Sequence, residues 1–154
     1  MNDKGLKILI VALVCLAGVV IGGGIFTFNN AKGLSYLSND PKACANCHVM
    51  QGTYDSWQKG GHQHAATCND CHLPHDSFVK KWYTKAENGW HHSLAFTLGN
   101  LPEHFTARPE SQQIVQDNCI KCHSNFASNA IHASNGDYDP LKCTSCHKNV
   151  GHIH

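Results

Sequence analysis

The chain has 154 residues and a formal net charge of +1 when histidine is counted as neutral. A near-neutral charge gives no indication of nucleic-acid binding, so we expect no nucleic-acid partner. Nine cysteines and 13 histidines are the most informative feature of the composition, because both residue types bind metals and cofactors.

An uncharged apolar run lies close to the N-terminus. Residues 8–28 read ILIVALVCLAGVVIGGGIFTF, about 31 Å long as a helix against a hydrocarbon core of about 30 Å. A cleaved signal peptide is the alternative, but its apolar part runs only about 7 to 15 residues and ends at an A-x-A-like site. We therefore predict a retained transmembrane helix in contact with membrane lipid. It belongs to an N-terminal segment 1–30, and a second domain covers 31–154.

Two features of this run have separate interpretations. Gly22, Gly23 and Gly24 permit close contact with another membrane helix, which leaves a homodimer open. Cys15 is expected to be a small apolar residue facing lipid or protein.

Four copies of the pattern C-x-x-C-H follow in the second domain. In c-type cytochromes the two thiols bind the haem vinyl groups and the adjacent imidazole reaches the iron. A lone C-x-x-C is also typical of a redox dithiol or of half a zinc site, but neither needs a histidine after every copy. The sequence therefore predicts four haems c, attached through Cys44, Cys47, Cys68, Cys71, Cys119, Cys122, Cys143 and Cys146.

The second domain has about 31 residues for each predicted haem, too few for an ordinary core of side chains. We expect a mainly α-helical, compact tetrahaem domain with extensive loops, in which the haems form the core. Haem is attached outside the cytoplasm. The domain is therefore expected in the periplasm, with the N-terminus in the cytoplasm and the anchor in the inner membrane.

Candidate iron ligands surround the first two motifs. Met50 comes two residues after His48, and a methionine ligand raises the potential of a haem relative to two histidines. A short helix with Tyr54 and Trp57 on one face is expected to end at the glycine pair 60–61. Further histidines that can reach an iron are His62, His64, His75 and His152.

Residues 76–98 are predicted to form a helix between the two halves. Phe78, Trp82, Lys85, Gly89 and His92 recur on one face at helical spacing. A lysine and a histidine about 10 Å apart among aromatic residues are unusual on a packing face. The alternative is that the lysines of this helix meet lipid headgroups. Two prolines, at 102 and 109, then indicate a turn-rich connection.

Taken together, the anchor, CxxCHxM, a Gly-His pair before CxxCHxPH, and CxxCHxxxxH resemble the NapC/NirT/NrfH family of membrane-anchored quinol dehydrogenases over essentially the full length. The compact tetrahaem form is most similar to the small subunits of cytochrome c nitrite reductase. The resemblance implies a set of axial ligands. These are Met50 on haem 1 with His48 unbound, His72 and His152 on haem 2, His123 and His62 on haem 3, and His147 on haem 4, whose second ligand is a lysine of the catalytic subunit.

The resemblance also implies a quinol site beside haem 1, with a lysine and an acidic residue. Lys85 matches the lysine, and His92 stands where the acid is expected; Glu87 and His91 are substitutes. The implied activity is oxidation of menaquinol and transfer of electrons to a periplasmic multihaem reductase that converts nitrite to ammonia. Alternatives are a nitrate or N-oxide reductase as partner, a tethered electron carrier without a quinol site, or a terminal reductase.

Overall fold

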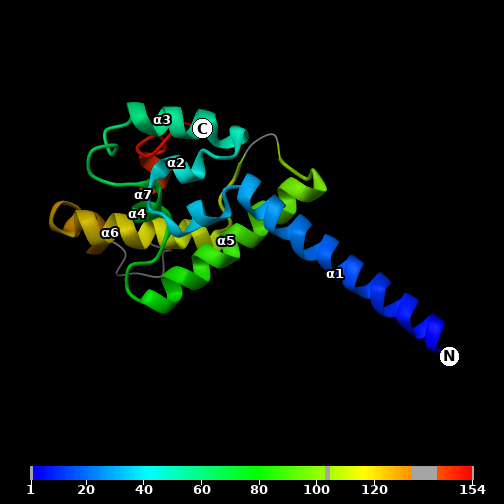
Figure 1. Ribbon diagram of the computed structural model, residues 1–154. Helices are drawn as coiled ribbons and strands as arrows, with labels where there is room; N and C mark the ends of the chain where they lie inside the picture. The colour runs from blue at the N-terminus through cyan, green and yellow to red at the C-terminus, as the bar shows by residue number, and fades with distance from the viewer. Residues whose placement is uncertain (1, 103–104, 133–141, 154) are drawn as a thin grey trace. The chain divides into compact units, whose positions relative to one another are not determined.

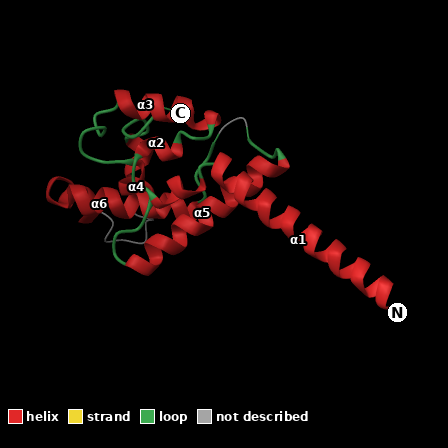
Figure 2. Cartoon of the chain, viewed as in Figure 1, coloured by secondary structure: helices red, strands yellow, loops and turns green. Residues whose placement is uncertain are grey.

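Every regular element in the part of the chain that the structure describes is a helix. The structure is a computed structural model and describes residues 2–102, 105–132 and 142–153. No strand occurs within these ranges (Figures 1 and 2), which confirms the mainly α-helical prediction. The elements are α1 Asp3–Asn30, η1 Gly33–Leu37, α2 Pro41–Cys44, η2 His48–Met50, α3 Gln51–Lys59, α4 Cys68–His72, α5 Phe78–Leu98, α6 Pro109–His132 and α7 Cys143–Cys146.

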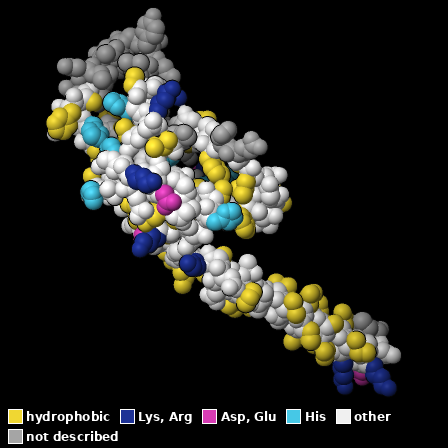
Figure 3. Space-filling view, turned by 90° about the horizontal axis from the view of Figure 1, so that it is seen from above, with side chains coloured by type: hydrophobic (Ala, Val, Ile, Leu, Met, Phe, Trp, Pro, Cys, Tyr) yellow, Lys and Arg dark blue, Asp and Glu magenta, His cyan; other side chains and the backbone are white. Residues whose placement is uncertain are grey.

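The first of two compact units covers residues 1–38 and consists mainly of α1. The side chain of Asn2 caps this helix by accepting a hydrogen bond from the N–H of Gly5 at 2.9 Å. None of its residues is buried, and its most apolar 18-residue window has a mean hydropathy of 2.8. Figure 3 shows apolar side chains along its length. The helix is therefore long and apolar enough to cross a membrane, as the sequence predicts.

The second compact unit covers residues 39–154, and within it each C-x-x-C-H motif meets a helix. The predicted domain boundary after residue 30 stays a prediction. Local sequence explains two of the helix starts. Asp40 caps α2 ahead of Pro41, and Thr67 and Asp70 form a reciprocal capping box at the start of α4. These caps fix the first turn in which the first two motifs lie.

Side chains contribute little core to this unit. Leu73, at 3 % exposure, is the one buried hydrophobic residue in the described part of the chain. The buried polar residues there are Thr84, Gln116 and Asn118. A domain of this size normally buries many apolar side chains, so this composition agrees with a fold built around prosthetic groups.

The predicted helix at 76–98 is confirmed as α5, which starts two residues later than expected. Ser77 precedes it, and Gly99 ends it in the left-handed conformation, with φ of 70°. The predicted face is not uniform. Phe78 is 76 % exposed, whereas Lys85 is half-buried.

Helix α6 was not predicted from the sequence. Pro109 starts this helix at its first position instead of marking only a turn. No glycine or proline follows until after His132, so nothing interrupts it. Arg108, just before its start, bonds to α5 through Glu87 Oε1 at 3.1 Å and Asn88 Oδ1 at 3.0 Å. The third motif therefore lies inside a long helix that is tied to α5.

Candidate functional site

Two pairs of histidine rings face each other across the second unit. The ring centres of His72 and His152 are 6.2 Å apart, and the planes are nearly parallel at 14°. The ring centres of His62 and His123 are 6.0 Å apart, and these planes cross at 73°. Each pair joins the histidine of one motif to a histidine outside the motifs. These are the two pairs that the sequence analysis assigned to haems 2 and 3.

The spacing of both pairs fits a metal held between two imidazoles. With metal–nitrogen bonds of about 2 Å, imidazoles on opposite sides of one metal ion have ring centres about 6 Å apart. Each pair also has two cysteines of its own motif beside it, which is the donor set of a covalently attached haem. The residues of this chain therefore fit haem c at these two positions. The assignment of each histidine to an iron remains a prediction.

Contacts outside the rings orient the histidine of the 60–66 loop. Trp57 Nε1 donates a hydrogen bond to the carbonyl oxygen of Ala66 at 3.1 Å, which closes this loop against α3. Gly60 ends α3 with its N–H donated to the carbonyl oxygen of Trp57 at 2.9 Å, as the glycine pair predicts. Within the loop, His62 Nδ1 lies 3.0 Å from the carbonyl oxygen of Val150. The neighbouring His64 is exposed and is not part of a histidine pair in the described structure.

The first and second motifs lie side by side, because the thiols of Cys44 and Cys68 share a hydrogen bond. That bond lowers the pKa of Cys44, while partial burial opposes the change. The same bond raises the pKa of Cys68, and burial raises it further. These shifts belong to the free thiols, before any haem is attached.

The later motifs are joined by polar side chains of α6. Asn118 Nδ2 donates to the carbonyl oxygens of Cys71 at 3.0 Å and Leu73 at 2.9 Å, which ties the second motif to the helix of the third. Gln116 Oε1 accepts the N–H of Cys143 at 2.8 Å, which ties that helix to the fourth motif. The four motifs are therefore neighbours in chain order: first to second, second to third, third to fourth.

Sequence reasoning missed Gln116 and Asn118. Both are buried polar residues whose hydrogen bonds reach segments 27 to 47 positions away. The position of Asn118 directly before Cys119 carries no signal that the side chain would point toward the second motif. Only the packing of α4 on α6 reveals it.

The candidate ligands of the end haems are arranged differently. Met50 is half-buried and His48 exposed in the short helix η2, so both remain candidates for haem 1. His147 is exposed at the end of α7. Within the described residues no second histidine ring faces it.

The candidate quinol residues lie along α5. Lys85 Nζ is 5.3 Å from the centre of the Trp82 ring, a cation–π distance. Burial lowers the pKa of Lys85, the positive charge of Lys81 lowers it further, and Cys44 opposes both effects. The influence of Cys44 means that Lys85 lies near the first motif, where the sequence analysis expected it.

The other predicted members of this site differ in their environment. Desolvation by the surrounding protein lowers the pKa of His92, and the charges of Arg108 and His91 lower it further. Its side chain is nevertheless exposed to solvent. Glu87 is bound to Arg108 in an ion pair at 3.1 Å. The pair therefore competes with any role of Glu87 as a proton acceptor.

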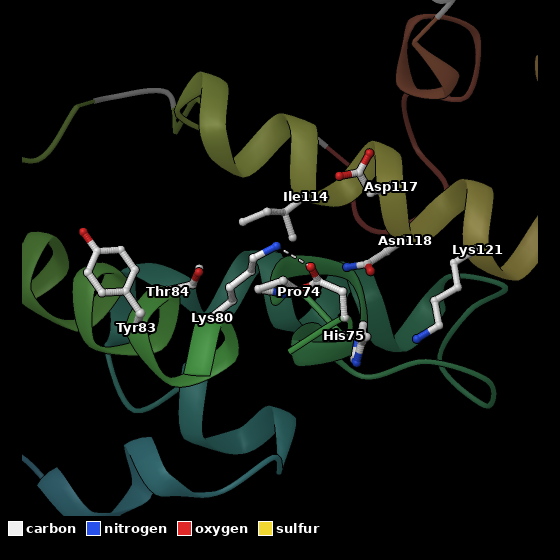
Figure 4. A pocket seen from close by; sticks show the side chains of 10 residues that line it. Pro74, His75, Lys80, Tyr83, Thr84, Ile114, Asp117, Asn118 and Lys121 are labelled. Carbon is white, nitrogen blue, oxygen red and sulfur yellow. Dashed lines mark hydrogen bonds and ion pairs between the residues drawn. The ribbon is translucent and has the colours of Figure 1, made fainter. Parts of the chain in front are cut away.

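A hollow of about 590 Å³ lies between α5, α6 and the segment after α4 (Figure 4). Lys80 and Asp76 form an ion pair at its edge. Apart from His75, none of the candidate quinol or iron ligands lines it. The lining residues are Pro74, His75, Asp76, Lys80, Tyr83, Thr84, Ile114, Asp117, Asn118 and Lys121.

Comparison with known proteins identifies the family. A family model described as the NapC/NirT cytochrome c family, N-terminal region, matches residues 5–154. The cytochrome c-type protein NrfH of Wolinella succinogenes is 38 % identical over 95 % of this chain and 87 % of its own length. The cytochrome c nitrite reductase subunit NrfH of Nitratidesulfovibrio vulgaris is 32 % identical over 80 % of this chain and 73 % of its own.

A solved structure supports the same conclusion at the level of the fold. A chain in the crystal structure of the cytochrome c nitrite reductase NrfHA complex bound to the HQNO inhibitor matches with a TM-score of 0.64 and 28 % identity. The match covers 98 % of this chain and 91 % of the other. The chain therefore belongs to the NapC/NirT cytochrome c family, whose members bind haem c.

Proposed function

We propose that this chain is a membrane-anchored tetrahaem cytochrome c that oxidises menaquinol and passes the electrons to a periplasmic cytochrome c nitrite reductase. The observation that carries the proposal is the succession of the four motifs, each in contact with the next. Such a series provides a path for electrons from one end of the second unit to the other. Each bound haem would supply a centre that accepts and gives one electron.

The path rests on named contacts. The first step joins Cys44 to Cys68, and the second runs through the bonds of Asn118 to the second motif. The third runs through the bond of Gln116 to Cys143. Haem attachment at these cysteines would bring successive porphyrin edges close together, because each thioether fixes one edge of its ring.

The axial ligands are proposed from the ring geometry and the family resemblance. The near-parallel pair holds haem 2 and the crossed pair holds haem 3. Met50 binds haem 1 and leaves His48 free of the iron. His147 binds haem 4 from one side, and a lysine of the reductase completes that site.

Quinol oxidation is assigned to the region beside the first motif. The reaction releases two electrons and two protons, so it requires a proton acceptor as well as an electron path. The half-buried Lys85, close to Cys44 and stacked on Trp82, is the group that orients the quinol. Since burial and neighbouring cations favour its neutral form, His92 is the proton acceptor that we propose; His91 is its substitute.

Assembly and orientation follow from the anchor and the relatives. The single apolar helix α1 anchors the chain, and we place it in the inner membrane with the haem domain in the periplasm. The names of two relatives and of the structural match point to nitrite reductase as the partner. Because NapC of Escherichia coli is 28 % identical over 89 % of this chain, another reductase is the alternative partner. A homodimer through α1 is compatible with this arrangement.

The quinol assignment is tested with one variant and a control on the same helix. The full-length protein is purified in mild detergent and mixed anaerobically with a menaquinol analogue. Lys85→Ala should abolish haem reduction by the analogue and leave reduction by dithionite intact. Lys80→Ala, which removes an exposed lysine paired with Asp76, should behave as wild type. A Lys85→Ala protein that is reduced at the wild-type rate would refute the role of Lys85.

A further inference from the structure

The C-terminal segment 150–153 is fastened to α3 and the loop after it. The carbonyl oxygen of Val150 lies 3.0 Å from His62 Nδ1, a contact between residues 88 positions apart. On the other side of the segment, the N–H of Ile153 donates a hydrogen bond to Ser56 Oγ. His152 lies between these two attachments. Its position is therefore set by bonds on both sides.

Gly60 allows the segment to approach this closely. A Cβ at this position would lie 3.2 Å from the carbonyl oxygen of Trp57 and 3.4 Å from that of Gly151. The backbone of Gly60 has a φ of −79°, which any residue adopts. An alanine would therefore act only through its methyl group, by pushing against the C-terminal segment. At the next residue, Gly61, a methyl group would have no neighbouring atom within 4 Å.

The bond to Val150 determines which nitrogen of His62 is available. A carbonyl oxygen only accepts hydrogen bonds, so Nδ1 carries the proton and Nε2 is left to bind a metal. Hydrogen bonds of this kind orient metal-binding histidines and raise their basicity. Movement of the C-terminal segment would change this bond and would shift the ring of His152 at the same time.

We propose that Ser56 and Gly60 are positioning residues for the distal ligands of two neighbouring haems, and that segment 150–153 couples these two sites. The inference rests on the proposed ligation of haems 2 and 3. A shared support keeps the two ligands in step. The ligand fields and reduction potentials of the two haems are then set together, in the middle of the electron path.

The two sites can be observed separately. The splitting of the iron d orbitals depends on the angle between the planes of the two imidazoles. The pair His72–His152 has an angle of 14° and the pair His62–His123 an angle of 73°. Their oxidised haems should therefore give two distinct low-spin EPR signals.

The test compares two neighbouring glycine variants of the full-length protein in detergent. Gly60→Ala should move both low-spin signals and both midpoint potentials. Gly61→Ala should match wild type. Ser56→Ala should move chiefly the signal of the near-parallel pair, because it releases the segment beside His152. Ser56→Thr, which keeps the hydroxyl group, should restore it.

Two results would overturn the coupling: Gly60→Ala spectra that equal those of Gly61→Ala, or a change confined to one signal. If Gly60→Ala binds fewer haems than wild type, Ser56→Ala and Ser56→Thr decide, and identical spectra for these two refute the role of Ser56. A wild-type protein without two bis-histidine signals refutes the ligation on which the inference rests. None of these spectra depends on quinol oxidation, so a failed quinol assay is a separate result.

Discussion

The two middle haem sites differ from the two end sites in how completely this chain builds them. The middle sites have histidines from both sides, at ring separations of 6.2 and 6.0 Å. At the ends, the half-buried Met50 lies next to its own motif, and His147 is exposed. The difference suggests a division of labour. The middle of the molecule holds electrons in closed sites, and its ends exchange them with quinol and with a partner.

Removal of a middle ligand should have the largest effect. His152→Ala leaves one haem with an open side, so that haem becomes high-spin and electron transfer to a reductase falls by at least about tenfold. His64→Ala is the control, since that exposed histidine belongs to neither pair. EPR and the rate of partner reduction measure both variants. An unchanged count of low-spin haems in His152→Ala would break the comparison between middle and ends.

The first end site is tested by replacement of Met50. With Leu in its place haem 1 loses a sulfur ligand, and its potential and its magnetic circular dichroism should change while haems 2 and 3 keep their signals. Substitution of His48 by Ala should leave the wild-type spectrum. A bis-histidine spectrum for all four haems of the wild-type protein would exclude Met50.

The buried polar links between motifs should affect stability more than spectra. Asn118→Leu removes two hydrogen bonds to the second motif and leaves two carbonyl oxygens without that donor, at a cost of about 1–3 kcal/mol in the free energy of unfolding. Gln113→Ala, on an exposed position of the same helix, should cost little. Denaturant unfolding, followed by far-UV circular dichroism, compares the two. Equal midpoints would mean that Asn118 does not hold the motifs together.

The smallest expected effect is a change in pH dependence. Because desolvation and nearby positive charges lower the pKa of His92, its neutral form persists below the usual histidine range. Quinol oxidation should therefore stay constant as the pH falls to about 6.5 and decline only below it, as His92 takes up a proton. In His92→Gln this acidic decline should disappear. A decline of the same shape in the variant would assign it to another group.

Much of the haem chemistry could be predicted from sequence, because it is written in local spacing. The four motifs, the apolar anchor, α5 and the glycine end of α3 all depend on residues close together in the chain. The role of Asn118, the ion pair of Arg108 and the bond from Ile153 to Ser56 depend on segments that meet only after folding. Helix α6 was missed for a different reason: Pro109 starts a helix as readily as it ends one.

The central claim is that electrons enter this chain from menaquinol and spread through four haems. Anaerobic titration of the purified full-length protein with a menaquinol analogue tests it most directly, with the haem content measured on the same sample. The account predicts four haems per chain, with reduction by the analogue beginning at the haem beside Lys85 and extending to the others. A protein whose four haems are reduced by dithionite and none by the analogue would contradict it.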